Sequence, residues 1–216
     1  MHLRVAERLL PFIPEGDESL FYTGCIAPDS GVPAKDGDTY TPPKQITHWQ
    51  NDLHQSRMED FYDRYAAGSQ FPRRAFYLGY YVHLATDELW KKLVYYPDKA
   101  RLEGEGCAPD QISAVLRGDW RHADAYFLNG RPDYGPFLAL RAIDVFPNDW
   151  LPYFSDDAIF LKIREIVSVF GAPSKDDGAF RIFTPQRADA FAAACSSELF
   201  ENLQKKNCDA MRRPIN

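Results

Sequence analysis

The residues best suited to chemistry lie in the apolar segment 79–90, where a histidine and an aspartate are four positions apart. On a helix this spacing places His83 and Asp87 on one face, one turn apart. A buried carboxylate is costly unless it is paired, protonated or bound to a cation. An imidazole and a carboxylate at this spacing can hold one divalent metal ion, and Gly79 leaves space for an incoming group. The alternative, which an isolated pair of this type favours, is a His–Asp hydrogen bond within the core.

Two more candidate ligands flank the Pro- and Gly-rich segment 27–47. Asp29 lies near its start, and His48 follows Thr47 at its end. Alone, Asp29 is suited to a turn and His48 to the surface. Together with the helical pair they supply two imidazoles and two carboxylates, a set that suits zinc, with manganese or iron as alternatives. Thr47 and Thr86 are placed to orient these ligands through hydrogen bonds.

The elements that must position these residues are predicted to be helical. Apolar periodicity and the placement of proline and glycine predict helices over 3–10, 18–26, 56–67, 72–95, 109–128, 133–144, 155–170 and 185–204. The helix over 72–95 is apolar on most of its circumference, which predicts a buried central helix. Segment 27–47 is expected to be a long loop and 205–216 a frayed tail. The expected fold is all-α, a multi-helix bundle that forms a single domain over 1–216.

Composition narrows the function classes. The chain has 216 residues, with 25 basic and 31 acidic side chains and a net charge of −6. This charge argues against a general nucleic-acid-binding protein, which needs a basic face. No apolar run approaches the roughly 18 residues of a membrane span, and the first residues lack the apolar core of a signal peptide, which favours the cytoplasm. The four cysteines are far apart and form no C-x-x-C motif, which favours free thiols.

The order of three motifs resembles the zinc-dependent phospholipase C family, and more loosely its intracellular bacterial relatives. The motifs are Gly-Cys-Ile-Ala-Pro-Asp over 24–29, Thr-His over 47–48, and the Leu-Gly-Tyr-x-x-His-x-x-x-Asp-x-x-Trp pattern over 78–90. The resemblance extends as far as Leu93. It implies a mostly helical fold with a metal cluster at its centre.

The resemblance also implies a ligand set. On the family pattern Asp29, His48, His83 and Asp87 surround one metal ion. His2 corresponds to a histidine that contributes to a neighbouring ion, with Asp87 bridging the two ions. Secreted members hold a further ion with additional histidines and a His-x-x-x-Glu pair, which this chain lacks after Asp87. One or two zinc ions are therefore expected, while His54 and His122 are expected at the surface or in packing.

The function that the resemblance implies is hydrolysis of a phosphoester, either a small molecule or a lipid-like substrate, by a metal-activated water. Asp29 and Asp87 are the expected catalytic carboxylates, with Asp29 as the base that takes the proton of the water. Segment 27–47 is expected to gate the site. Three basic side chains are expected to bind the phosphate of the substrate, namely Lys44, Arg73 and Arg74. Tyr40 is also expected to contact the substrate.

Two other function classes remain open. A non-catalytic helical scaffold that binds metal or a lipid-like ligand fits the missing downstream ligands and the aromatic content of 14%. An HD-type phosphohydrolase would also be helical and metal-dependent, but the sequence has no adjacent His-Asp dipeptide. A spare coordination position on the metal and turnover of a generic phosphodiester would favour the hydrolase over the scaffold.

Overall fold

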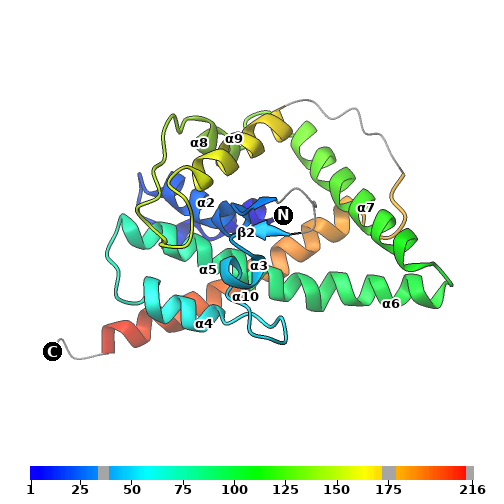
Figure 1. The fold of residues 1–216 in the computed structure, drawn as a ribbon, viewed down its shortest axis with the longest axis horizontal. Coiled ribbons are helices and arrows are strands. Elements are labelled where there is room, and N and C mark those ends of the chain that lie inside the picture. The colour runs from blue at the N-terminus through cyan, green and yellow to red at the C-terminus, as the bar shows by residue number, and fades with distance from the viewer. Residues whose placement is uncertain (34–38, 172–178, 213–216) are drawn as a thin grey trace.

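A computed structural model describes residues 1–33, 39–171 and 179–212, and this part of the chain is mostly helical (Figure 1). The α-helices are α1 (His2–Arg8), α2 (Glu18–Ile26), α3 (Lys44–Thr47), α4 (Met58–Phe61), α5 (Arg73–Trp90), α6 (Tyr96–Gly104), α7 (Pro109–Asn129), α8 (Gly135–Arg141), α9 (Ala158–Gly171) and α10 (Pro185–Arg212). Short 3-10 turns cover Leu10–Phe12 and Ala27–Asp29, and π-helical turns cover Tyr62–Ala66 and Lys91–Tyr95. The predicted all-α class is confirmed.

Helix α5 is the buried central helix that the sequence predicts. Every residue from Ala75 to Thr86 is buried. The π-helical turn Lys91–Tyr95 carries the helix to its predicted end, but α6 then continues without a break. Pro97 has no N–H for a helical hydrogen bond, and it lies in the first turn of α6, directly after the wider π-helical turn. The chain therefore passes Pro97 without leaving the helix.

Helix α2 crosses α5 at two glycines. A Cβ atom on Gly24 would lie 1.9 Å from the carbonyl oxygen of Phe76, and one on Gly79 would lie 2.0 Å from that of Phe21. Only glycine permits such an approach of two backbones. The expectation that Gly79 leaves space for an incoming group is therefore wrong, because the backbone of α2 fills that space.

Segment 27–47 is more ordered than the expected loop. After the turn Ala27–Asp29, strands β1 (Val32–Pro33) and β2 (Tyr40–Thr41) pair in antiparallel register, and α3 follows. Residues 34–38, within the expected gate, lie outside the described residues. The short strands and α3 hold His48 in position beside α5.

The C-terminal helix is longer than predicted. Helix α10 continues to Arg212, so the expected frayed tail is wrong for 205–212, while 213–216 lie outside the described residues. Contacts with other elements hold this extension. Lys206 forms an ion pair with Glu59 and lies 4.1 Å from the ring centre of Tyr62, and Asn207 accepts a hydrogen bond from Arg74.

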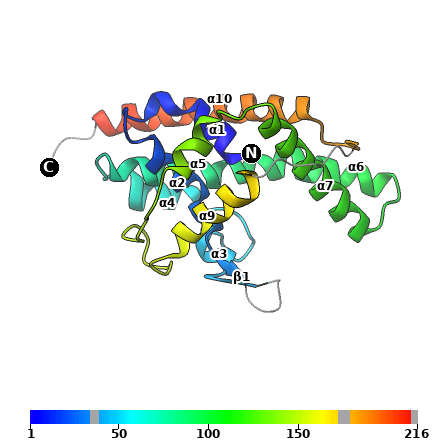
Figure 2. The same cartoon turned by 90° about the horizontal axis from the view of Figure 1, so that it is seen from above.

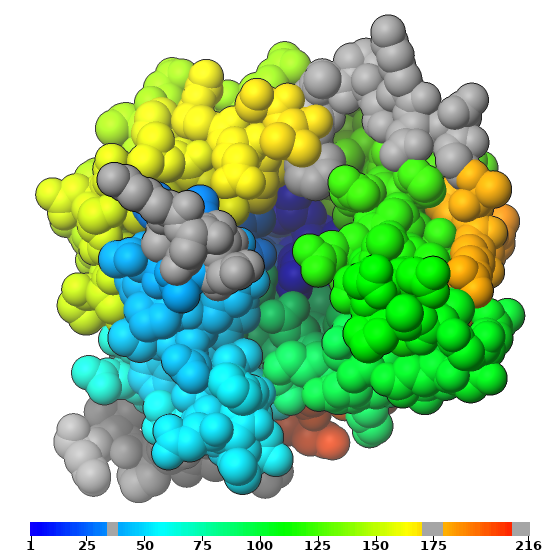
Figure 3. Space-filling model, turned by 45° about the vertical axis from the view of Figure 1, so that its right-hand side comes forward, coloured from blue at the N-terminus to red at the C-terminus, as the bar shows by residue number. Residues whose placement is uncertain are grey.

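Helices α8, α9 and α10 pack against α1 or α2. Helix α10 lies along α1 and α5 (Figure 2), and α7 and α9 stand on two sides of the N-terminal segment. Figure 3 shows a hollow between α9, in yellow, and α7, in green, with the N-terminal segment in dark blue at its floor. Among the described helices, none has the length and apolar character needed to cross a membrane.

Candidate metal centre

The five side chains predicted as metal ligands lie together beside the C-terminal half of α5. Their ligand atoms form two groups, each within 4.8 Å, and these groups share His83. One group adds His2 from α1 and Asp87 from α5, and the other adds Asp29 and His48. Residues from four separate parts of the first 90 positions therefore meet at one place.

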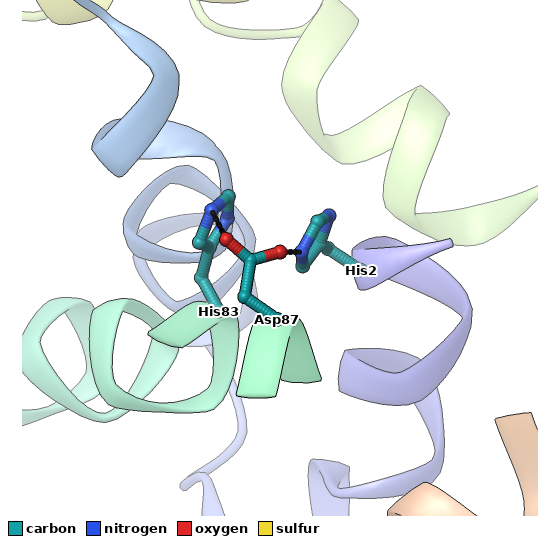
Figure 4. Close-up of side chains that lie close together, drawn as sticks. All are labelled: His2, His83 and Asp87. Atoms are coloured by element: carbon teal, nitrogen blue, oxygen red, sulfur yellow. Dashed lines mark hydrogen bonds and ion pairs between the residues drawn. The ribbon is translucent and has the colours of Figure 1, made fainter. Parts of the chain in front are cut away.

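Asp87 lies between the imidazoles. Its Oδ1 atom is 2.9 Å from Nε2 of His2, and its Oδ2 atom is 3.6 Å from Nε2 of both His83 and His48. Figure 4 shows the two carboxylate oxygens of Asp87 directed at different rings, one at His2 and the other at His83. One carboxylate that faces two sides has the arrangement expected of a bridging ligand.

The protonation state of His83 follows from its backbone contact. Its Nδ1 atom lies 2.8 Å from the carbonyl oxygen of Cys25, which can only accept, so Nδ1 carries the proton. The Nε2 atom is buried and has no hydrogen-bond partner among the described residues. Burial and the neighbouring His2 ring hold the pKa of His83 below its usual value, so the His83 ring is neutral at neutral pH. Its Nε2 lone pair is therefore available to a metal ion.

The contact between His83 and Cys25 depends on the close crossing of α2 and α5. Because Gly24 and Gly79 let the two backbones touch, the carbonyl group that follows Gly24 reaches the ring one turn after Gly79. The His83 ring is also stacked on His2, with ring centres 3.9 Å apart and planes 5° apart. These contacts fix the ring orientation before any ligand binds.

His48 is oriented by its neighbour in the chain. Thr47 Oγ1 lies 2.9 Å from His48 Nδ1 and accepts a hydrogen bond when Nδ1 carries the proton, which leaves Nε2 free for a metal. The Thr47 carbonyl in turn accepts a hydrogen bond from Tyr80 of α5. The matching expectation for Thr86 is not supported, because its hydroxyl is the acceptor for the thiol of Cys195.

Both carboxylates of the cluster are ionised at neutral pH. Desolvation raises the pKa of Asp29, but the imidazole of His48, 3.4 Å away, and the nearby rings of His83 and His2 outweigh that effect and hold the pKa well below the usual range. Desolvation of Asp87 is likewise outweighed, first by His83 and then by the hydrogen bond with His2, so its pKa is also low. An ionised carboxylate is the form that binds a metal.

Two of the four residues expected at the substrate lie beside the cluster. A small pocket of about 80 Å³ is lined by Asp29, Tyr40 and Lys44, together with Lys162 of α9. Sequence reasoning missed Lys162 because it lies on a distant helix without a motif. A cavity of about 290 Å³ is also lined by Asp29 and Lys162.

The two expected arginines lie elsewhere. Arg73 is ten residues before His83, which corresponds to about 15 Å along a helix. It donates to the carbonyl of Asp149 at 2.9 Å, and Arg74 donates to the side chain of Asn207 at 3.0 Å. Neither is among the residues that line the cavities beside the cluster. Their positions give no support to a role at the substrate phosphate.

The remaining histidines lie outside the cluster, as expected. His54 is exposed in the loop before α4, and His122 of α7 contacts the ring of Phe180. Asp124, two residues further along α7, lines the same cavities as His2 and lies 3.5 Å from the amino group of Met1. No sequence motif marks Asp124, and only the folded chain brings α7 to this place.

The cluster as a whole has the donor set of a metal site. A simple core hydrogen bond explains His2 and Asp87, but it leaves a buried, proton-free nitrogen of His83 unsatisfied within the described part of the chain. Three imidazoles and two ionised carboxylates fit zinc, and also manganese or iron. Comparisons with protein-family models, curated proteins and solved structures find no match for this chain.

Proposed function

We propose that this protein is a metal-dependent hydrolase that acts on phosphoesters. The observation that carries the proposal is the Nε2 atom of His83, which is buried, proton-free and without a partner among the described residues, 3.6 Å from an ionised carboxylate. The resemblance of three motifs to the zinc-dependent phospholipase C family supports the same function. The ligands would be His2, Asp29, His48, His83 and Asp87.

The metal would supply an activated water and a positive charge beside the phosphoryl oxygens. Asp29 is the cluster carboxylate with the more accessible side chain, 44% exposed, against 29% for Asp87. Asp29 is ionised at neutral pH and lines both pockets. We therefore assign it as the base that takes the proton of the attacking water. Lys44 and Lys162 line the pocket beside it and would bind the phosphate oxygens.

The test is elemental analysis of purified protein with matched variants. Wild type is expected to contain about one or two equivalents of zinc, manganese or iron. His83→Asn and Asp87→Asn should lose the metal, because each removes a ligand atom. The controls are His54→Asn and Asp63→Asn, which make the same chemical changes at exposed positions.

Activity is measured on the same set of proteins with phosphomonoesters and phosphodiesters that release a chromophore. Turnover by wild type and both controls, but not by the two ligand variants, is the expected result. Metal retained by His83→Asn and Asp87→Asn would contradict the ligand assignment. Metal held stoichiometrically without turnover of any phosphoester would instead favour the non-catalytic scaffold.

A further inference from the structure

The cavity of about 290 Å³ beside the cluster has a reactive end and an apolar wall. His2, Asp29 and His83 form the reactive end. The wall consists of apolar side chains from α2, α7, α8 and α9, namely Ile26, Phe127, Leu128, Phe137 and Ile166. Figure 3 shows the hollow in this region between α7 and α9. A cavity with this composition is suited to the organic part of a small ligand.

Most charged groups that line the cavity already have partners. Lys162 lies 2.7 Å from Glu165 one turn along α9. Asp124 faces the amino group of Met1 at 3.5 Å, and Asp29 faces His48 at 3.4 Å. The charges of these groups are therefore balanced within the protein, apart from the roles that Asp29 and Lys162 take in the proposed function.

Two residues that line the cavity each have one buried hydrogen-bonding atom without a partner in the described part of the chain. The side chain of Arg4 is 6% exposed, and Tyr134, just before α8, is 5% exposed. Arg4 pairs with Asp189 through Nη2 and lies 4.0 Å from the ring centre of Phe127, but its Nη1 atom has no hydrogen bond to any described residue. The hydroxyl of Tyr134 likewise has no such partner.

The Nη1 group of Arg4 can only be satisfied by an acceptor, and the hydroxyl of Tyr134 can donate to the same acceptor. Arginine has no acceptor atom and keeps its charge at all relevant pH values. Burial raises the pKa of Tyr134, so its hydroxyl keeps its proton and remains able to donate. A guanidinium and a phenol hydroxyl that line one apolar cavity are complementary to an anionic oxygen group.

We propose that the cavity binds the organic part of the substrate and that Arg4 and Tyr134 bind a carboxylate on it. This inference rests on the proposed function, since the phosphoester is placed at the cluster end of the cavity. At roughly 30 Å³ for each water-sized group, the cavity holds about ten non-hydrogen atoms. The substrate class is therefore a phosphoester whose organic part carries a carboxylate.

The test uses two stable phosphonates of the same carbon chain, 3-phosphonopropionate and propylphosphonate. Calorimetry on the metal-loaded protein should show about tenfold tighter binding of 3-phosphonopropionate, because only this probe offers a carboxylate to the two donors. Tyr134→Phe should abolish most of this preference and leave the affinity for propylphosphonate unchanged. It removes a hydroxyl without a described partner, so the fold should keep its stability.

Two further variants complete the test. Tyr126→Phe makes the same change on an exposed side chain of α7 outside the cavity lining, and it should retain the full preference. Arg4→Lys keeps a positive charge beside Asp189 but removes the Nη1 donor, and it should weaken 3-phosphonopropionate binding about tenfold. Equal affinity of wild type for the two phosphonates, or a preference unchanged in Tyr134→Phe, would overturn the carboxylate assignment.

Failure of the proposed function gives a different result. If the metal is absent and neither phosphonate binds, the hydrolase proposal fails, and glutarate alone then tests the cavity. Glutarate binding that Tyr134→Phe weakens and Tyr126→Phe does not would support the carboxylate site on its own. A lack of glutarate binding in that case would overturn the cavity assignment as well.

Discussion

The environment of His83 distinguishes it from a histidine that merely fills a core. A core histidine normally satisfies both ring nitrogens, since a buried polar atom without a partner costs about 1–3 kcal/mol. The structure gives Nδ1 a carbonyl partner and leaves Nε2 without one among the residues it describes. A bound metal would recover that cost, as the proposed function requires.

Thr47 offers a test of how the ligands are oriented. Thr47→Val removes the hydroxyl beside His48 Nδ1 and should weaken zinc binding about 10- to 100-fold, as expected for loss of a hydrogen bond to a ligand. The matched control is Thr86→Val, which breaks the contact with Cys195 and should leave zinc affinity unchanged. Zinc affinity is measured by competition with a chromophoric chelator. Equal zinc affinities of the two variants would show that Thr47 does not orient His48.

Metal binding should depend on pH through the imidazoles. A ligand histidine must be neutral, and an unperturbed imidazole has a pKa of about 6.5. Burial lowers the pKa of His83, so this ring stays neutral to lower pH than an exposed histidine. The increase in melting temperature caused by zinc should therefore be constant above about pH 7 and decline as the pH falls below about 6.

Scanning calorimetry with and without zinc at each pH measures this increase. His83→Asn supplies the control, because it should show no zinc-dependent increase at any pH. An increase in wild type that is as large at pH 5 as at pH 7.5 would exclude a site built on histidines.

Four of the five candidate ligands could be predicted from short local patterns, whereas His2 was expected only from the family resemblance. His83 and Asp87 share one helical face, and Asp29 and His48 bound one Pro- and Gly-rich segment. Lys162 could not be predicted in this way, since its place beside Asp29 depends on how α9 packs. Arg73 was expected near the substrate from its place at the start of the helix, but ten residues of helical rise separate it from His83.

At the scale of elements, the crossing of α2 and α5 ties the metal centre to helix packing. The two glycines allow backbone contact, and that contact brings the Cys25 carbonyl to His83. Any side chain at Gly24 or Gly79 would push the helices apart and break this hydrogen bond. The site geometry is therefore a property of the helix pair as well as of the ligands.

Substitution of Gly79 tests its role at the crossing of α2 and α5 separately from the effect of glycine on helix propensity. Gly79→Ala should lower the free energy of unfolding by about 3 kcal/mol or more, because the new Cβ meets backbone that cannot move aside like a side chain. It should also reduce zinc affinity, since His83 loses its carbonyl partner. The control is Gly118→Ala in α7, where a Cβ meets nothing within 4 Å, and it should stabilise by up to about 1 kcal/mol.

Urea unfolding and zinc titration of the two alanine variants measure both effects. A Gly79→Ala protein as stable as wild type would show that the helices can separate without cost. Retention of full zinc affinity by a destabilised but folded Gly79→Ala protein would show that the Cys25 carbonyl is not needed to hold His83.

Most helices could be predicted from apolar periodicity, but where some of them end and how closely they cross could not. Proline usually ends a helix, and only the preceding π-helical turn explains why Pro97 does not. The extension of α10 beyond 204 depends on Lys206, whose partners come from distant parts of the chain. The function of Gly79 depends on the backbone of another helix, which local pattern cannot show.

At the scale of the whole molecule, buried carboxylates fasten the start of α10 to the helices that enclose the site. Asp119 of α7 accepts hydrogen bonds from the backbone N–H groups of Arg181, Ile182 and Phe183, at 3.1, 2.6 and 2.7 Å. Asp98 of α6 pairs with Arg187 of α10 at 2.9 Å. Because α10 lies along α1, which carries His2, these links also support one wall of the candidate metal centre.

Replacement of Asp119 tests this connection. Asp119→Asn removes the charge and turns an N–H group toward backbone N–H groups, so at least one buried hydrogen bond is lost and stability should fall by about 3 kcal/mol. Amide exchange at 181–183 should quicken, and zinc affinity should fall less than in His83→Asn because no ligand is touched. The control is Glu105→Gln, which makes the same change in an exposed ion pair with Arg181 and should alter stability little. Glu105→Gln could instead destabilise the protein as much as Asp119→Asn. The loss of stability would then reflect the charge of Arg181, and the buried hydrogen bonds of Asp119 would not be what connects α7 to α10.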